Sequence, residues 1–249
     1  MNKIIPLSEG SFTVGSNKKF IPFNPEMDHL NDRVRGSLLV EIQPFVVITS
    51  QDILLIDSGL GFKDPDGTLQ IHQNLLRNGI NPMDVTKVLM SHLHKDHAGG
   101  LAVEEVSTGL RTLAFPFAQH YISRNEWNYA ISQDGLSYHC SDFTILEGRD
   151  NLTLLDDSGV IDGYIKYETS GGHCPFHMVF LIEESEGLIF YGGDEASQLS
   201  QMKTRFKAKY DYDGEKSMHL REFYWSEGIK HHWQMLFYHD IKVPVIQLG

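Results

Sequence analysis

The segment Ser91-His92-Leu93-His94-Lys95-Asp96-His97-Ala98-Gly99-Gly100 places four side chains of metal-ligand type within six residues. Imidazole nitrogens and carboxylate oxygens bind zinc and other divalent transition metals. One tight loop cannot easily wrap His92, His94, Asp96 and His97 around a single ion. Alternation along the backbone would direct the first two one way and the last two another, which suits two ions about 3.5–4 Å apart. The two glycines then let the chain turn sharply beneath the site.

Short apolar runs bounded by turn residues predict β-strands on both sides of this segment. They cover residues 37–49, 53–56 and 87–90 in the first half, and 152–155, 164–168 and a hairpin of 178–182 with 188–191 in the second. Helical spacing of apolar residues predicts a helix over 69–76 that Gly79 would end. A charged, aromatic-rich helical stretch is expected within 203–228, and a last apolar run covers 235–238.

Four polar residues fall just after strand-like runs, namely Asp57, His92, Asp194 and His239. Strand ends are where a rigid sheet can aim side chains into a common cleft. The interleaved strands and helices predict an α/β fold of packed sheets with helices on the outer faces. No Pro/Ser-rich linker divides the chain, so residues 1–249 are expected to form a single domain.

The composition of the chain limits which classes of partner it is expected to bind. The 249 residues carry a formal net charge of −12, which disfavours a nucleic-acid substrate because phosphate backbones are repelled. The densest basic cluster is followed at once by acidic residues and is interpreted as a solvated helix face. It consists of Lys203, Arg205, Lys207 and Lys209, and the acidic residues after it are Asp211, Asp213 and Glu215.

The expected location is the cytoplasm. The stretch before Pro6 is too short for the apolar core of a signal peptide, and no run approaches the roughly 20 apolar residues of a membrane span. Only two cysteines occur, Cys140 and Cys174, which is no disulfide framework and agrees with a reducing compartment. No membrane partner is expected.

The His-x-His-x-Asp-His pattern of residues 92–97 resembles the signature of the metallo-β-lactamase superfamily. The resemblance covers nearly the whole chain, because further motifs of that family follow in order. They are Asp57 in Leu55-Ile56-Asp57-Ser58-Gly59, His173 in Gly171-Gly172-His173, Asp194 in Tyr191-Gly192-Gly193-Asp194, and His239 after the last apolar run. The resemblance implies a four-layer αββα sandwich with metals at one edge of the two sheets.

The resemblance also implies a role for each motif residue. His92, His94 and His173 would hold a first metal; Asp96, His97 and His239 would hold a second; Asp194 would bridge them. Two zinc ions are the expected cofactor, although iron or manganese accepts the same ligands. A water between two such ions has its pKa lowered from about 15.7 toward about 7, which gives a hydroxide nucleophile at neutral pH.

Three residues are assigned catalytic roles: Asp96, Asp57 and His177. Asp96 would act as a metal ligand, and Asp57 would orient a metal ligand without binding the metal itself. His177 lies four residues after His173, where related lactonases and thioesterases often carry a histidine; a structural hydrogen bond and a catalytic role both stay open. Cys174 is interpreted as a small buried residue rather than a metal ligand or redox thiol.

The resemblance narrows to one branch of the superfamily. Asp96 and Asp194 argue against an antibiotic-degrading enzyme, and His94 stands where the flavodiiron reductases carry a glutamate. The acidic chain lacks the basic exosites of the nucleases, and the basic glutathione region of hydroxyacylglutathione hydrolases is not identified. The segments 88–94 and 172–177 resemble N-acyl homoserine lactonases and the organophosphate hydrolases near them. Ser197 departs from that pattern, because the lactonases carry a catalytic tyrosine there.

The leading functional hypothesis is hydrolysis of a small ester, lactone or thioester. Phosphoester or phosphotriester hydrolysis on the same metals is an alternative, and a mononuclear iron sulfur dioxygenase shares the ligand pattern. A non-enzymatic metal-binding module is disfavoured because every ligand position is filled. The partner is expected to be a small molecule, and the lactonase resemblance suggests a homodimer. An aromatic set is interpreted as core or as pocket lining: Phe20, Phe23, Trp127, Tyr129, Phe223, Tyr224 and Trp225.

Overall fold

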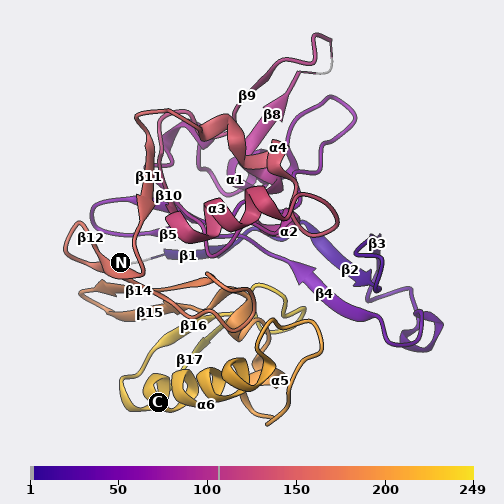
Figure 1. The fold of residues 1–249 in the computed structure, drawn as a ribbon, viewed down its shortest axis with the longest axis vertical. Coiled ribbons are helices and arrows are strands. Elements are labelled where there is room, and N and C mark those ends of the chain that lie inside the picture. The colour runs from indigo at the N-terminus through magenta and orange to yellow at the C-terminus, as the bar shows by residue number, and fades with distance from the viewer. Residues whose placement is uncertain (1–2, 106) are drawn as a thin grey trace.

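The computed structural model describes residues 3–105 and 107–249 and arranges them in layers (Figure 1). Two β-sheets face each other in the middle of the molecule, and helices cover the outer face of each sheet. This is the αββα sandwich that the sequence predicts. None of the helices in the described ranges is long and apolar enough to span a membrane.

The first sheet comes from the N-terminal part of the chain. In spatial order its strands are β1 (Lys3–Pro6), β5 (Phe45–Ile48), β6 (Ile53–Ile56), β7 (Lys87–Leu89), β10 (Gln119–Ser123) and β11 (Leu152–Leu155). β1, β5 and β6 pair antiparallel, whereas β6, β7, β10 and β11 pair parallel. Because parallel strands need crossover connections, helices return the chain across the outer face.

The second sheet comes from the C-terminal part. In spatial order its strands are β12 (Ser158–Ile161), β13 (Ile165–Thr169), β14 (Met178–Glu184), β15 (Gly187–Tyr191), β16 (Gln234–Leu236) and β17 (Val245–Gln247). The predicted hairpin is confirmed as β14 and β15, and β16 then pairs parallel to β15.

Helices occupy the two outer layers and several strand ends. The α-helices are α1 (Gln70–Arg77), α2 (Lys95–Ala98), α3 (Arg124–Ser132), α4 (Cys140–Phe143), α5 (Leu199–Met202) and α6 (Gly214–Lys230). The 3-10 helices are η1 (Leu30–Asp32), η2 (Pro82–Asp84), η3 (Gly99–Leu101), η4 (Thr144–Leu146) and η5 (Gly193–Ala196). The helix predicted over 69–76 is confirmed as α1, and Gly79 follows it with φ +76°.

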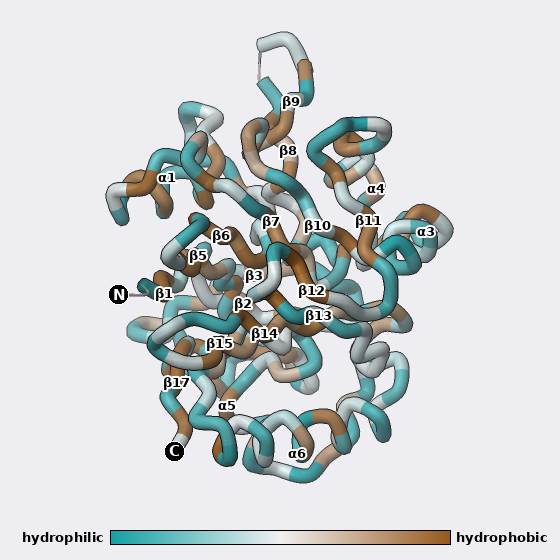
Figure 2. The backbone as a smooth tube through the Cα atoms, turned by 90° about the vertical axis from the view of Figure 1, so that its left-hand side faces the viewer, coloured by the Kyte–Doolittle hydropathy of each residue, from teal (hydrophilic) through white to brown (hydrophobic). Residues whose placement is uncertain are grey.

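Alternation of side chains along the strands fills the spaces between layers. Val46 and Leu55 point toward the helices, where they pack with residues of α1 and α3. Val47 and Leu54 point the other way, into the space between the two sheets. Strands buried on both faces read as continuous apolar runs, which is why the sequence reveals them. Figure 2 shows these hydrophobic stretches, such as β6 and β14, gathered in the middle of the molecule.

The predicted strand over 37–49 is wrong as a single element. The chain forms β4 (Leu38–Ile42) and then β5, and these strands belong to different sheets. Pro44 stands between them and has no N–H to continue a ladder. β4 instead pairs with β2 (Gly10–Val14), which pairs with β3 (Phe20–Pro22). We call this small sheet with the loop 23–37 the flap, and it projects from the sandwich beside α2 (Figure 1).

The charged stretch within 203–228 is helical only in its second part. Residues 203–213 follow α5 without regular structure, so the basic cluster lies on an exposed loop and not on a helix face. α6 begins at Gly214 because the Asp213 carboxylate accepts a hydrogen bond of 3.0 Å from the backbone N–H of Lys216. A short hairpin of β8 (Ala102–Glu104) and β9 (Arg111–Leu113) completes the fold.

Candidate metal centre

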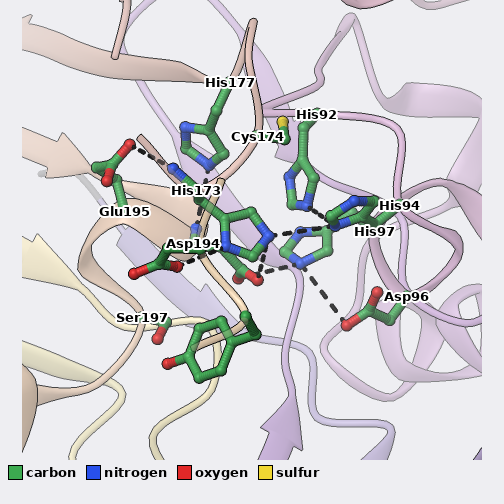
Figure 3. A network of polar contacts seen from close by, with 12 residues as sticks. His92, His94, Asp96, His97, His173, Cys174, His177, Asp194, Glu195 and Ser197 are labelled. Atoms are coloured by element: carbon green, nitrogen blue, oxygen red, sulfur yellow. Dashed lines mark hydrogen bonds and ion pairs between the residues drawn. The ribbon is translucent and has the colours of Figure 1, made fainter. Parts of the chain in front are cut away.

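The strand ends of both sheets meet at one edge of the sandwich, and the candidate ligands lie there (Figure 3). Asp57 directly follows β6, and His92 follows the end of β7. From the second sheet, His173 lies between β13 and β14, Asp194 follows β15, and His239 follows β16. The tertiary structure thus brings together residues that are up to 182 positions apart, 239 minus 57.

The 92–97 motif separates its ligands by a change of backbone conformation, not by strand alternation. His94 is extended, with φ −61° and ψ 148°, and stands at the N-cap of α2. Asp96 and His97 therefore project from a helical turn, whereas His92 and His94 project from the extended segment before it. His92 lies with His94 and Asp96 lies with His97, but the predicted alternation along the backbone is wrong.

The two glycines after the motif serve close packing, not a sharp turn. Gly99 has an ordinary helical φ of −60°. A Cβ on Gly99 would collide with the carbonyl of Leu60, and one on Gly100 with the carbonyl of Ser58. The loop that carries Asp57 therefore lies directly against the end of the motif segment.

His92, His94 and His173 form a first group of converging ring nitrogens. His92 Nε2 lies 2.9 Å from His94 Nδ1, and His94 Nδ1 lies 3.2 Å from His173 Nε2. One ligand atom from each residue falls within 4.8 Å of the other two. Burial lowers the pKa of His92 and of His94 well below its usual value, so both rings are neutral, which is the form that binds a metal.

Asp96, His97 and His239 form a second group, and Asp194 lies between the two groups. Asp194 Oδ1 is 3.2 Å from His97 Nε2 and 2.9 Å from His239 Nε2, whereas Oδ2 is 3.2 Å from His173 Nε2. Asp96 Oδ2 lies farther off, 3.8 Å from His97 Nε2 and 3.7 Å from His239 Nε2. One carboxylate thus faces both groups, with one oxygen toward each.

The charged side chains of the second group favour the binding of a cation. Burial opposes a charge on His97, but the carboxylates of Asp194, Asp57 and Asp96 outweigh it and raise its pKa well above the usual value. Burial likewise opposes ionisation of Asp194, but His239, His173 and His97 hold its pKa well below the usual range. A divalent ion would supply the positive charge that a proton on His97 otherwise supplies.

Two buried atoms support that fit. His97 Nε2 and Asp194 Oδ1 lie 3.2 Å apart, but neither atom makes a well-oriented hydrogen bond among the described residues. Buried polar atoms are rarely left without a partner. Since both atoms point into the space between the two groups, the donor set fits divalent metal ions there.

Asp57 holds the second group from behind. It is fully buried, with a left-handed φ of +56°. Its carboxylate accepts hydrogen bonds from the Ser91 N–H at 2.7 Å, the Ser91 hydroxyl at 2.6 Å and the Tyr191 hydroxyl, and lies 2.7 Å from His97 Nδ1. The contact places the His97 proton on Nδ1 and leaves Nε2 for the site. Asp57 is therefore a positioning residue, because it does not reach the pocket.

His177 has both ring nitrogens engaged within the protein. Nδ1 lies 2.9 Å from the Ser170 hydroxyl, and Nε2 accepts a hydrogen bond of 3.1 Å from the Asp194 N–H. Burial and the neighbouring His173 lower the pKa of His177 to about 3. These contacts make a neutral ring that fixes the backbone at Asp194, which favours the structural alternative left open by the sequence.

Sequence reasoning missed two buried carboxylates that hold His173. Glu195 Oε2 accepts hydrogen bonds from the N–H groups of Gly172 and His173 at 3.0 and 3.1 Å. Asp211 Oδ1 lies 3.1 Å from His173 Nδ1, and its side chain has 0% exposure. Asp211 contradicts the solvated-face interpretation, because Arg221, itself 2% exposed, lies 3.5 Å from its other oxygen. The one signal for these two carboxylates in the sequence is that Glu195 directly follows the candidate ligand Asp194.

A pocket of about 260 Å³ opens over the two groups. His94, Asp96, His173, Asp194 and His239 form what we call its floor. The flap and the segment after Asp194 form its sides, which we call the wall: Val14, Lys18, Phe20, Arg33, residues 37–40, Ser197, Gln198, Gln201 and Tyr210. Lys95 and Ser137 also line it. A cavity of this size suits a small molecule.

Most of the predicted aromatic set lies in the core. Trp127 and Tyr224 are buried in the clusters on the two outer faces, Phe223 is 54% exposed, and only Phe20 lines the pocket. Cys174 is buried, and its thiol lies 3.5 Å from Glu126 Oε2. Burial raises the pKa of Cys174 well above its usual value, so it is an inert small residue, as the sequence analysis favoured.

Comparison with known proteins agrees with this geometry. The profile of the metallo-β-lactamase superfamily matches residues 41–224. Over 111 residues the chain is 35% identical to the N-acyl homoserine lactonase AttM of Azorhizobium caulinodans. That match covers 42% of this chain and only 38% of the relative's own length.

Solved structures share the fold over almost the whole chain. A probable metal-dependent hydrolase from Staphylococcus aureus aligns with a TM-score of 0.76 and 22% identity, covering 99% of this chain and 92% of that one. AidC, a dizinc quorum-quenching lactonase, aligns with a TM-score of 0.69 and 18% identity, covering 98% and 89%. At these identities the alignments establish the fold.

Proposed function

The chain belongs to the metallo-β-lactamase superfamily, and on that premise we propose that it is a hydrolase that uses two zinc ions to cleave a small ester, lactone or thioester. The observation that carries the proposal is the position of Asp194. Its two oxygens face two separate groups of imidazoles at 2.9–3.2 Å. His92, His94 and His173 would hold one ion, Asp96, His97 and His239 the other, and Asp194 both.

Metal ions bound there would acidify a water and polarise the substrate carbonyl. The protein's own residues keep the ligands in position. Asp57 and Asp211 each lie against the Nδ1 atom of a histidine, His97 and His173 respectively, and so direct Nε2 toward the site. The flap places apolar side chains such as Val14 and Val40 over the floor, which excludes water and suits the carbon chain of a substrate.

Tyr210 has a hydroxyl that is available to donate a hydrogen bond to a substrate, whereas the Ser197 hydroxyl already donates within the protein. The Ser197 hydroxyl donates to Gln201 Oε1 at 3.1 Å, whereas the Tyr210 oxygen accepts from Gln201 Nε2 at 3.1 Å. Burial and the neighbouring Asp211 raise the pKa of Tyr210 to about 12, so its proton stays in place at neutral pH. Tyr210 lines the pocket and would donate a hydrogen bond to the leaving oxygen of an ester or lactone.

A phosphoester is the second candidate substrate class, and the basic side chains Lys18, Arg33 and Lys95 in the pocket favour it. A panel of 4-nitrophenyl butyrate, an N-acyl homoserine lactone, a butyryl thioester and bis(4-nitrophenyl) phosphate separates the classes. The proposal expects turnover of the carbonyl substrates to exceed that of the phosphoester.

The decisive experiment is metal removal and return on protein purified without a histidine tag. We expect two zinc ions per chain by elemental analysis, loss of ester turnover on chelation and recovery when zinc is added. Thermal unfolding of the chelated protein checks that it stays folded. One iron per chain with thiol-dependent oxygen uptake would replace the proposal with the dioxygenase alternative, and a metal-loaded protein inert on the whole panel would end it.

A further inference from the structure

Three cationic side chains share the pocket with the candidate metal ligands. Lys18, Arg33 and Lys95 line it, although the chain as a whole carries a net charge of −12. The carboxylates in the same lining, Asp96 and Asp194, are already engaged with His97, His173 and His239. The pocket of this acidic protein thus holds three cationic side chains beside two carboxylates that already face histidines.

In residues 3–105 and 107–249, none of these cations forms a direct ion pair with a carboxylate, although the charges of Asp96 and Asp142 act on Lys95 from nearby. Lys18 and Lys95 are close enough to repel each other, and the metal ions of the proposed function would add to that repulsion. Like charges gathered in a partly enclosed pocket are unfavourable unless an anion joins them.

The cations come from separate elements whose positions are fixed. Lys18 ends an ordered turn between β2 and β3, where its N–H donates to the Gly15 carbonyl at 3.0 Å and its φ is +55°. Arg33 is held in the flap loop by hydrogen bonds to the carbonyls of Leu30 and Ser37. The Lys95 ammonium lies 5.8 Å from the centre of the Phe20 ring. The flap therefore contributes two of the three cations that share the pocket with the floor.

We infer that the pocket selects substrates that carry an anionic group, a carboxylate or a phosphate, on the same small molecule as the bond to be cleaved. The scissile carbonyl would lie on the floor, the carbon chain along Val14 and Phe20, and the anion between Lys18 and Lys95. A lysine ammonium group acts as a point charge and can bind either a carboxylate or a phosphate. The inference rests on the proposed function for the position of the scissile bond.

Substrates matched in size but not in charge test the inference. 4-Nitrophenyl butyrate is neutral, whereas mono-4-nitrophenyl glutarate carries a carboxylate at the end of a similar acyl chain. We expect the zinc-loaded protein to have the higher kcat/KM for the glutarate ester. In Lys18→Gln the ratio of the two kcat/KM values should fall about fivefold, the worth of one partly screened charge contact.

Lys19→Gln is the matched control. Lys19 is the next residue, carries the same charge, is exposed and does not line this pocket. It should keep the wild-type ratio, and Lys18→Glu should lower the ratio further than Lys18→Gln does. Equal kcat/KM values for the two esters in the wild type, or equal ratios in the Lys18→Gln and Lys19→Gln variants, would overturn the inference.

A binding measurement separates this inference from the proposed function. Calorimetric titration of the zinc-loaded protein with glutarate, 3-phosphonopropionate and butyrate compares ligands that share one carboxylate and differ in the second anion. Glutarate or the phosphonate should bind more tightly than butyrate, with the difference reduced in Lys18→Gln, and the preferred anion identifies the source. If that pattern appears without turnover of any ester, the hydrolase proposal fails and the anion site stands. If esters are cleaved with no preference for a charged substrate, the anion site fails and the hydrolase proposal stands.

Discussion

The floor and the wall of the pocket are built on opposite principles. Among the histidines at and behind the floor, the ring nitrogens that point away from the site mostly have protein partners: His97 Nδ1 contacts Asp57, His173 Nδ1 contacts Asp211, and His239 Nδ1 donates to the Glu41 carbonyl at 2.7 Å. On the wall, the cations of the flap have no carboxylate partner in the described chain. The difference indicates that the floor is fixed for one chemistry, whereas the wall is left to be completed by a substrate.

Removal of a floor ligand is expected to have the largest effect. His94→Ala should lower turnover by more than the roughly 100-fold that loss of an outer partner of a ligand can cause. The variant should still fold, because His94 faces the pocket and its loss leaves no unpaired charge in the core. Steady-state kinetics and zinc content measure the effect, and thermal unfolding checks the fold.

His231→Ala is the control for that variant, because His231 is exposed at the end of α6. If His94→Ala turns over substrate as fast as the control, the floor is not needed for catalysis, and the contrast drawn between the floor and the wall is wrong.

Removal of a support behind the floor should have an intermediate effect. Asp211→Asn keeps the shape but loses the charge beside His173 Nδ1, so zinc affinity should fall by about 10-fold. Competition with a chelating dye measures it. Asp213→Asn is the matched control, since it loses the same charge two residues on and asparagine caps a helix as well as aspartate does. Equal zinc affinity in the two variants would mean that Asp211 is not part of the support.

A buried carboxyl group at the base of the flap should affect stability while changing turnover least. Glu9 precedes β2, is 4% exposed, and accepts a hydrogen bond of 2.7 Å from the Leu60 N–H. Burial raises its pKa from 4.5 to about 8. The neutral form is favoured in the folded protein, so this stabilisation is complete below pH 4.5 and is lost as the pH rises toward about 8. The free energy of unfolding should fall by about 1.4 kcal/mol per pH unit in that window because of Glu9 alone.

Urea unfolding of wild type and Glu9→Gln at several pH values between 5 and 8 isolates this contribution. The difference between the two proteins should change with pH in favour of the variant at the alkaline end. The exposed Glu26→Gln in the flap loop should show no such trend. A pH-independent difference between wild type and Glu9→Gln would mean that Glu9 is ionised in the folded protein.

The sequence predicted the fold well, and the structure brings the predicted site residues together at one edge of the sandwich. Buried strands appear as apolar runs, and candidate site residues stand at or near the ends of those runs, as Asp57 and Asp194 do. It failed where a pattern fits two arrangements. Residues 37–49 look like one strand until Pro44 directs the two halves into different sheets, and Asp211 looks solvated until Arg221 and His173 surround it.

By itself, then, the sequence determined that sheets pack together with helices on the outer faces, and which histidines and aspartates are available as ligands, since periodicity and residue type need no distant partner; the αββα sandwich followed from the family resemblance. Only the tertiary structure decided that His177 holds the Asp194 backbone, that Glu195 and Asp211 fix His173, and that Lys18 and Lys95 line one pocket. The physical reason is that these roles depend on residues far apart in the sequence, such as 177 with 194 and 173 with 211, and the folded backbone alone sets which side chains meet.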